Sequence, residues 1–265
     1  MTKILAAPSI IFILSLCAFA QETRNLTPAQ IEIEKQQQRL SSGDEEERRD
    51  ALMKLGAMRL AEASRAALPA LKDPAPIIRA TAAKAVLWIG PEESVSFLIP
   101  LLEDKNEFVR REAAYALGLT RSRGATAALS ERLLNDKQEA VRGAAAVALG
   151  EIADEAGVIA LVLTLAPELS TATGKKRKRE ENAFVLRAAA RSLGQTGSRA
   201  GSAALISALS NEKLSSDVRR EAARSLGLIG DPAAEAALRA ASKSADPYLS
   251  EIAFKALQAI HRLHR

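Results

Sequence analysis

The segment VRREAAYALG at residues 109–118 recurs as VRREAARSLG at residues 218–227, with eight of its ten residues unchanged. VRGAAAVALG at 141–150 and the more divergent IIRATAAKAV at 77–86 follow the same pattern. Aligning all copies on one anchor position gives spacings of 31, 31, 32, 44, 33 and 31 residues. Self-similarity at a fixed period predicts an array of repeated structural units, with one insertion of about a dozen residues. The anchors are Glu47, Ile78, Val109, Val141, Val185, Val218 and Leu249.

Each repeat is expected to form two helices. In the third repeat, residues 93–104 carry apolar side chains at helical spacing, as do residues 108–120 after the link KNE. Gly118 is expected to weaken or end the second of these helices. A single hairpin cannot bury both of its faces, whereas stacked hairpins cover one another. The first helix of the array, at residues 28–40, is strongly polar, as a terminal unit requires, and Thr27 is its expected N-cap.

The composition favours closely packed helices. Hydrophobic residues make up 48% of the chain and aromatic residues only 3%. Alanine and leucine therefore carry the apolar content, and both favour helices over sheets. The formal net charge of +5 is a modest excess that favours weak attraction to anions and carries no information about the fold.

The first twenty residues predict a secretion signal, which leaves residues 21–265 as one solenoid domain. Lys3 precedes an apolar run at residues 10–19, and Ala18 and Ala20 are small residues suited to cleavage after Ala20. The run is shorter than the roughly 20 residues of a membrane-spanning helix. A periplasmic or secreted protein is expected. An uncleaved N-terminus, or one lipidated at Cys17, would instead anchor it to the membrane.

The repeated segments resemble HEAT-like repeats, in particular the short variety named after phycobilin lyases. The resemblance covers about residues 28–264. It implies an all-α fold, an α-solenoid in which about seven two-helix repeats form a right-handed superhelix. Pro69 and Pro100 lie in first helices, where such repeats often carry a kink-forming proline. Because one fold hosts many functions, the resemblance alone assigns no activity.

The resemblance also implies a structural ladder between neighbouring repeats. In similar arrays, carboxylates contact turn amides and guanidinium groups of the next repeat. The later repeats depart from this pattern, since Glu180 and Lys213 stand where aspartate is expected, and Leu186 where arginine is expected. The residues expected to form the ladder are Asp73 with Arg79, Asp104 with Arg110, and Asp136 with Arg142.

No catalytic residue, metal or cofactor is expected. His261 and His264 indicate a basic helix end, with a shared metal site as the alternative. HEAT-like deoxyhypusine hydroxylases bind iron through His-Glu pairs, and this sequence contains no His-Glu dipeptide. The sequence also lacks a G-x-S-x-G motif and a phosphate-binding P-loop.

The insertion at about residues 170–182 contains five consecutive cations, from Lys175 to Arg179. A solvated loop is the simplest interpretation of this run. The alternative is contact with an anionic partner or with lipid headgroups at a membrane surface. The loop is also the expected first site of limited proteolysis.

A basic stripe is expected on the concave side, which the second helices line in similar arrays. Positions two and six after each anchor share one helix face. Guanidinium groups there favour carboxylate, phosphate or sulfate. The alternative is an ordinary solvated face, because Glu112 and Glu221 accompany the arginines. The candidate binding residues are Arg111, Tyr115, Arg187, Arg191, Arg220 and Arg224.

The favoured function is a non-catalytic protein–protein interaction scaffold of the bacterial envelope or exterior, binding an acidic protein on the concave face. One alternative is a HEAT-like lyase or an enzyme accessory subunit. Another is a structural, envelope-associated protein without a discrete ligand. Nucleic acid is not the expected partner, and a steep salt dependence of binding would be needed to support it.

Overall fold

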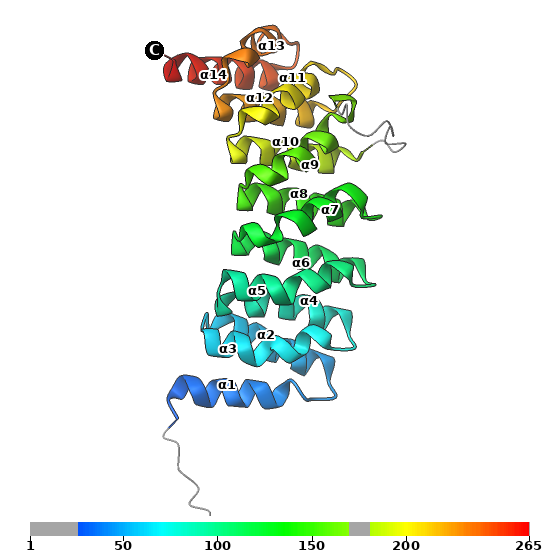
Figure 1. The fold of residues 1–265 in the computed structure, drawn as a ribbon, viewed down its shortest axis with the longest axis vertical. Helices are drawn as coiled ribbons and strands as arrows, with labels where there is room; N and C mark the ends of the chain where they lie inside the picture. The colour runs from blue at the N-terminus through cyan, green and yellow to red at the C-terminus, as the bar shows by residue number, and fades with distance from the viewer. Residues whose placement is uncertain (1–25, 170–180, 265) are drawn as a thin grey trace, which may run out of the picture.

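The computed structural model describes residues 26–169 and 181–264, in which every regular element is helical. Fourteen α-helices form seven consecutive hairpins stacked along one axis (Figure 1). The predicted all-α solenoid of about seven two-helix repeats is therefore confirmed. The predicted signal segment at residues 1–20 lies outside the described residues, as do the cations from Lys175 to Arg179.

The helices alternate between two layers. The first helices of the seven units are α1 (Pro28–Arg39), α3 (Ala61–Ala67), α5 (Pro91–Leu98), α7 (Thr126–Asn135), α9 (Glu155–Leu165), α11 (Ser202–Ser210) and α13 (Glu235–Ala241). The second helices are α2 (Glu45–Ala57), α4 (Pro76–Ala85), α6 (Glu107–Thr120), α8 (Glu139–Ile152), α10 (Ala183–Thr196), α12 (Ser216–Ile229) and α14 (Pro247–Leu263). All seven predicted anchors lie in second helices. The long spacing falls between η5 (Pro167–Leu169) and α10.

The N-terminal unit begins at the expected residue. The hydroxyl of Thr27 accepts a hydrogen bond from the backbone N–H of Gln30, and the Gln30 side chain accepts one from the Thr27 backbone N–H. This reciprocal capping box satisfies two N–H groups that have no partner within the helix. Asp44 caps α2 with a single hydrogen bond, which its side chain accepts from the backbone N–H of Glu46.

Proline divides the first helices of the second and third units. Residues 93–104 do not form the single helix expected from their apolar spacing. Instead, α5 gives way to the 3₁₀ helix η3 (Ile99–Glu103), with Pro100 in its first turn. Pro69 has the same place in η1 (Leu68–Lys72). Proline lacks the N–H that an α-helix needs and clashes with the preceding turn, so the backbone tightens there.

The second helices pack closely on one another through small residues. Gly118 does not end α6, which continues to Thr120. A Cβ at Gly118 would lie 2.7 Å from the Cα of Ala148 in α8, so only glycine permits this approach. The same position is glycine in four other units, facing a small residue of the next second helix. These pairs are Gly56 with Ala85, Gly150 with Ser192, Gly194 with Ser225, and Gly227 with Ala256.

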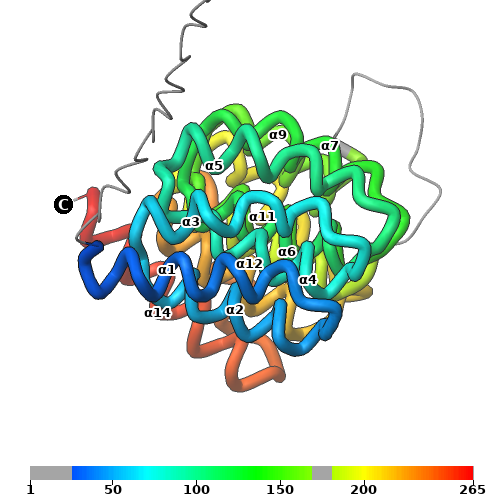
Figure 2. The backbone as a smooth tube through the Cα atoms, turned by 90° about the horizontal axis from the view of Figure 1, so that it is seen from below, coloured from blue at the N-terminus to red at the C-terminus, as the bar shows by residue number. Residues whose placement is uncertain are grey.

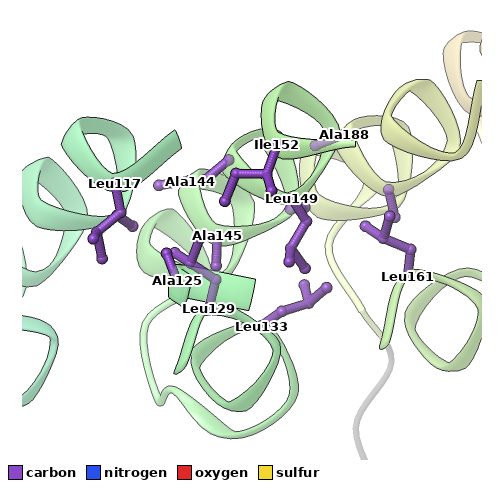
Figure 3. Close-up of a cluster of buried hydrophobic side chains, with 14 of the residues drawn as sticks. Leu117, Ala125, Leu129, Leu133, Ala144, Ala145, Leu149, Ile152, Leu161 and Ala188 are labelled. Carbon is purple, nitrogen blue, oxygen red and sulfur yellow. The ribbon is translucent and has the colours of Figure 1, made fainter. Parts of the chain in front are cut away.

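The core runs continuously between the two layers. Figure 3 shows its middle, where Leu129 and Leu133 of α7 lie under Leu149 of α8. These three leucines are fully or almost fully buried. Contacts among second helices are more extensive than those among first helices. The more closely spaced layer lies on the inside of a curved stack, so the second helices form the inner layer (Figure 2).

A positive φ recurs twelve residues after the anchor, at or shortly after the end of the second helix. The residue there has a positive φ in six units, whether or not it is glycine. In α8 it is Ala153, with φ 53°, and in α10 it is Gly197, with φ 67°. This left-handed conformation ends a helix, and it disfavours any residue with a Cβ by about 1–2 kcal/mol.

Replacing Ala153 with glycine is therefore expected to raise the free energy of unfolding by about 1 kcal/mol, because relief of strain exceeds the added entropy of the unfolded chain. The matched change Gly197→Ala is expected to lower it by a similar amount. Urea denaturation followed by circular dichroism measures both. A loss of stability in the Ala153→Gly variant would contradict the assignment of strain to this position.

Candidate interaction face of the second helices

An acid–base ladder joins neighbouring units at the turns between their helices. Arg79 donates to both carboxylate oxygens of Asp104 in the next unit, at 2.7 and 2.8 Å, and to the backbone oxygens of Asp73 and Pro74 in its own turn. Asp104 in turn accepts from the backbone N–H of Asn106. The guanidinium group thus ties its own turn to the turn that follows it.

The ladder residues expected from the sequence lie together, but each aspartate pairs with the preceding unit. Arg110 donates to Asp136 at 2.8 and 3.0 Å. Asp73 accepts from Arg48, a residue that the six-residue spacing did not include. Arg142 donates to Glu181 at 2.9 and 2.6 Å, while Glu180 lies outside the described residues.

The ladder is interrupted after the insertion, at α10 and at the turn of the next unit. Leu186 stands in the arginine position of α10, and Lys213 in the expected acid position of the next turn. Arg219 donates to the backbone oxygen of Leu209. In the last step, Arg220 and not Arg219 donates to Asp246, at 3.0 and 2.9 Å.

The ladder makes the fold sensitive to acid. Hydrogen bonds from Arg79 lower the pKa of Asp104 below its usual value of 3.8; burial opposes this shift, and the Asn106 amide adds to it. Arg220 likewise lowers the pKa of Asp246. A carboxyl with a lowered pKa in the folded state stabilises the fold above its unfolded pKa, and this contribution is lost as the pH falls through the folded pKa.

The melting temperature is therefore expected to fall steeply as the pH drops from about 5 to about 2. The Asp104→Asn variant, which cannot ionise, should melt lower at neutral pH and lose less on acidification. Calorimetric melts of the two proteins across this range measure the difference. Parallel curves would show that the carboxylate of Asp104 does not couple protonation to folding.

The residues of the expected basic stripe lie on the side of the second helices that faces away from the first helices, hereafter the second-helix face. Several of them are engaged within the fold. Arg111 pairs with Glu112 at 3.0 Å and lies over the ring of Phe108, 4.8 Å from its centre. Tyr115, one turn further along α6, is half-buried. Arg111 is therefore held by its neighbours, and Tyr115 is only partly available for binding.

Arg220 and Arg224 also have partners inside the protein. Arg220 is held by Asp246 in the ladder, pairs with Asp217 at 3.2 Å, and lies over the ring of Tyr248. Arg224 pairs with Glu221 at 2.9 Å. The charges of these two candidate binding residues are thus neutralised within the fold. A pattern of single positions could not show this, because Asp246 lies 26 residues from Arg220.

Arg187 and Arg191 remain available. Both are exposed on α10, four residues apart and therefore on one side of the helix. Neither forms an ion pair with a residue in the described ranges 26–169 and 181–264. The adjoining Leu186 is the same residue that interrupts the ladder. These are two cations on the inner layer of the solenoid whose charge no described neighbour neutralises.

Apolar groups adjoin this pair of arginines. The ring of Phe184 covers Gly143 of α8, where any side chain would collide with it, and yet 43% of Phe184 is exposed. Val147 of α8 is half-buried on the same face. Phe108, Phe184 and Tyr248 each lie one residue before an anchor. These aromatic residues could have been found from the sequence, because they share a third repeated position. The candidate binding residues were taken only from positions two and six after each anchor.

Two grooves are formed by the N-terminal half of the solenoid. One lies over α4 on the second-helix face, between α2 and α6, with a volume of about 470 Å³. The other, of about 720 Å³, lies on the first-helix side, where Pro69 and Pro100 interrupt adjacent helices. Neither groove was predicted, since both result from small or kinked positions in neighbouring units.

The described residues contain no metal-binding group of three or more His, Cys, Asp or Glu side chains. His261 lies 3.5 Å from Glu235, whereas the Nε2 atom of His264 lies 2.9 Å from the backbone oxygen of Gly230. The two rings therefore have different partners. Within the described part of the chain, no helix is both long enough and apolar enough to cross a membrane.

The stacked hairpins, shared ladder and inner layer of second helices define a repeat protein of the α-solenoid class. The family of HEAT repeats matches residues 33–118, 97–168 and 175–260, and the chain belongs to this family. A comparison with curated protein sequences finds no significant match.

Two solved structures show the same architecture. YibA of Escherichia coli has a TM-score of 0.59 at 19% identity, with 88% of this chain and 82% of that chain covered. The complex of CpcE and CpcF of phycocyanin lyase from Nostoc sp. PCC7120 gives 0.50 at 25% identity, covering 97% of each chain. Human deoxyhypusine hydroxylase in complex with glycerol gives 0.44 at 22% identity, with 87% and 84% covered.

Proposed function

We propose that this protein is a non-catalytic scaffold of the bacterial envelope or exterior that binds an acidic segment of another protein on the second-helix face. The observation that carries the proposal is the pair Arg187 and Arg191. These exposed guanidinium groups lie among apolar side chains and lack a carboxylate partner in the described chain. Such groups bind carboxylates in paired geometry and are enriched at interfaces.

Membership of the HEAT-repeat family supports a repeat scaffold that presents an extended surface. The location is supported by the sequence of residues 1–20, with its basic start, apolar run and small residues before position 21. In this location a protein partner is the more direct source of clustered carboxylates. Exposed cations attract such a segment at long range, and adjoining apolar groups add area on contact.

A second candidate is an accessory subunit of an enzyme of the lyase type. It is favoured by the similarity to the phycocyanin lyase complex, which extends over 97% of both chains. In that case the chain would act with a second protein and bind a chromophore or similar ligand. An absorption spectrum of the protein purified from its natural source would show a bound chromophore if this candidate is correct.

The proposed function is tested by reversing two charges. The variant Arg187→Glu/Arg191→Glu is compared with the wild type for binding of a fluorescent glutamate-rich peptide, measured by anisotropy. We expect at least a tenfold loss of affinity, because two attractive contacts become repulsive. Affinity capture from the envelope fraction, followed by mass spectrometry, should lose the same acidic partner.

The matched control is Arg123→Glu/Arg199→Glu, which changes the net charge equally. Both arginines are exposed in the 3₁₀ turns η4 (Arg123–Ala125) and η6 (Arg199–Gly201), away from the second-helix face. The control should bind the peptide nearly as well as the wild type. Equal losses in the two variants would show that net charge, and not the second-helix face, attracts the peptide.

A further inference from the structure

The groove over α4 lies on the same face as Arg187 and Arg191, and its floor is made of small side chains. Ala80 and Ala85 of α4 and Gly56 of α2 lie beneath it. Thr81 completes the floor, and its hydroxyl donates to the backbone oxygen of Ile77 in its own helix. These floor residues therefore present no side-chain donor or acceptor to the groove that lacks a hydrogen-bond partner.

The walls of the groove are longer apolar side chains from the flanking helices. Met53 of α2 is 59% exposed, and Phe108 of α6 stands opposite it across α4. Methionine adapts its shape to a bound group, and aromatic rings provide a large rigid surface. A volume of about 470 Å³ is in the range of pockets that hold bulky apolar groups.

Cations outnumber anions at the rim. Glu112 is almost fully buried and lies between Lys84 at 2.7 Å and Arg111 at 3.0 Å. Arg49 pairs with Glu46 at 3.3 Å, both in α2. The charged residues that line the groove are Arg49, Lys84 and Glu112, which leaves a positive excess around an apolar floor. This arrangement complements an apolar side chain whose neighbours along the chain are acidic.

The distance between the groove and the free arginines sets the length of a ligand that reaches both. Neighbouring helices in such arrays lie about 8–10 Å apart, so the three steps from α4 to α10 span roughly 25–30 Å. An extended chain rises about 3.3 Å per residue and covers this distance in roughly eight or nine residues. A bound helix, at about 1.5 Å per residue, would need roughly twice as many.

We infer that the groove over α4 holds a bulky apolar side chain of the same acidic segment that Arg187 and Arg191 bind. The segment lies extended along the second-helix face, with its apolar anchor and its acidic cluster about eight residues apart. This inference rests on the proposed function and adds to it a second contact and a spacing. The two contacts on one chain act as linked sites, so together they bind more tightly than either alone.

The test uses three labelled peptides: one with a leucine-phenylalanine anchor, a spacer of about eight residues and a run of glutamates, one with the anchor alone, and one with the glutamates alone. Against the wild type, the two-ended peptide should bind roughly tenfold more tightly than the glutamate peptide, as expected for burial of one large apolar side chain. The variant Thr81→Trp fills the groove and should abolish that gain. It should leave binding of the glutamate peptide unchanged.

Met53→Ala, at an exposed position, removes a wall of the groove and should reduce the gain without affecting folding. The matched control is Ser96→Trp, which fills the groove on the first-helix side and should alter nothing. If the two-ended peptide binds Thr81→Trp as tightly as the wild type, or binds no better than the glutamate peptide, the groove inference is overturned. Loss of glutamate binding in Arg187→Glu/Arg191→Glu reports separately on the proposed function. Failure of all peptides to bind the wild type would overturn both.

Discussion

Replacing Asp136 with alanine is expected to lower the free energy of unfolding by about 3–5 kcal/mol, the range typical of breaking a buried ion pair. The side chain of Asp136 is 2% exposed, and its partner Arg110 is 14% exposed. Without the carboxylate, the guanidinium group of Arg110 stays buried beside the turn, with its charge uncompensated. The backbone N–H of Gln138 also loses its acceptor. Denaturation in urea, followed by circular dichroism, measures the loss.

The control for this variant is Glu103→Ala. Glu103 also pairs with an arginine, Arg132, but its side chain is 71% exposed. Exposed pairs contribute up to about 1 kcal/mol at most, so a change below this value is expected. If Asp136→Ala lowered the free energy of unfolding by no more than Glu103→Ala, the ladder would not contribute to holding neighbouring units in register.

Replacing Gly118 with alanine is expected to destabilise the fold by about 1–3 kcal/mol, the usual cost of overpacking. Helix propensity alone predicts the opposite sign, since alanine is favoured over glycine by about 1 kcal/mol within a helix. The added Cβ would lie 2.7 Å from the Cα of Ala148, which is backbone and cannot rotate away. Helices α6 and α8 must then separate, and the change reduces contacts on both sides of α8.

The sign of this change is decisive. Gly43→Ala provides the control, because a Cβ at Gly43 would have no atom within 4 Å. Calorimetric melting of both variants is sufficient to compare them. A higher melting temperature for Gly118→Ala would show that the second helices are not packed at the distance described.

The number of repeats and the positions of the second helices could be predicted because they depend on local patterns. Each second helix carries its own apolar stripe, and the anchors recur at nearly constant spacing. Gly118 was misjudged because glycine has two opposite uses, as a helix terminator and as a close-contact residue. Only the neighbouring Ala148, 30 residues away in the sequence, decides between them.

The binding face was harder to predict because a charged residue is defined by its partners. Arg187 and Arg220 occupy equivalent positions in consecutive repeats. Arg220 is neutralised by Asp246, whereas Arg187 has no such acid in the described chain. Arg219 occupies the position equivalent to Arg110, yet it donates to the backbone oxygen of Leu209, and Arg220 makes the contact with Asp246 instead. Ion pairing across units depends on loop geometry, which repeat spacing does not specify.

The central claim is that Arg187 and Arg191, which have no ion-pair partner in the described chain, make the contact with an acidic segment on the second-helix face. The most direct measurement is a titration with the glutamate peptide, monitored by the arginine Nε–Hε resonances in NMR spectra. Lysine substitutions at the two positions assign their signals. The account predicts that these two resonances shift together, while those of Arg79, Arg110 and Arg220 stay fixed in the ladder. Shifts at the ladder arginines, or at none of the five, would contradict it.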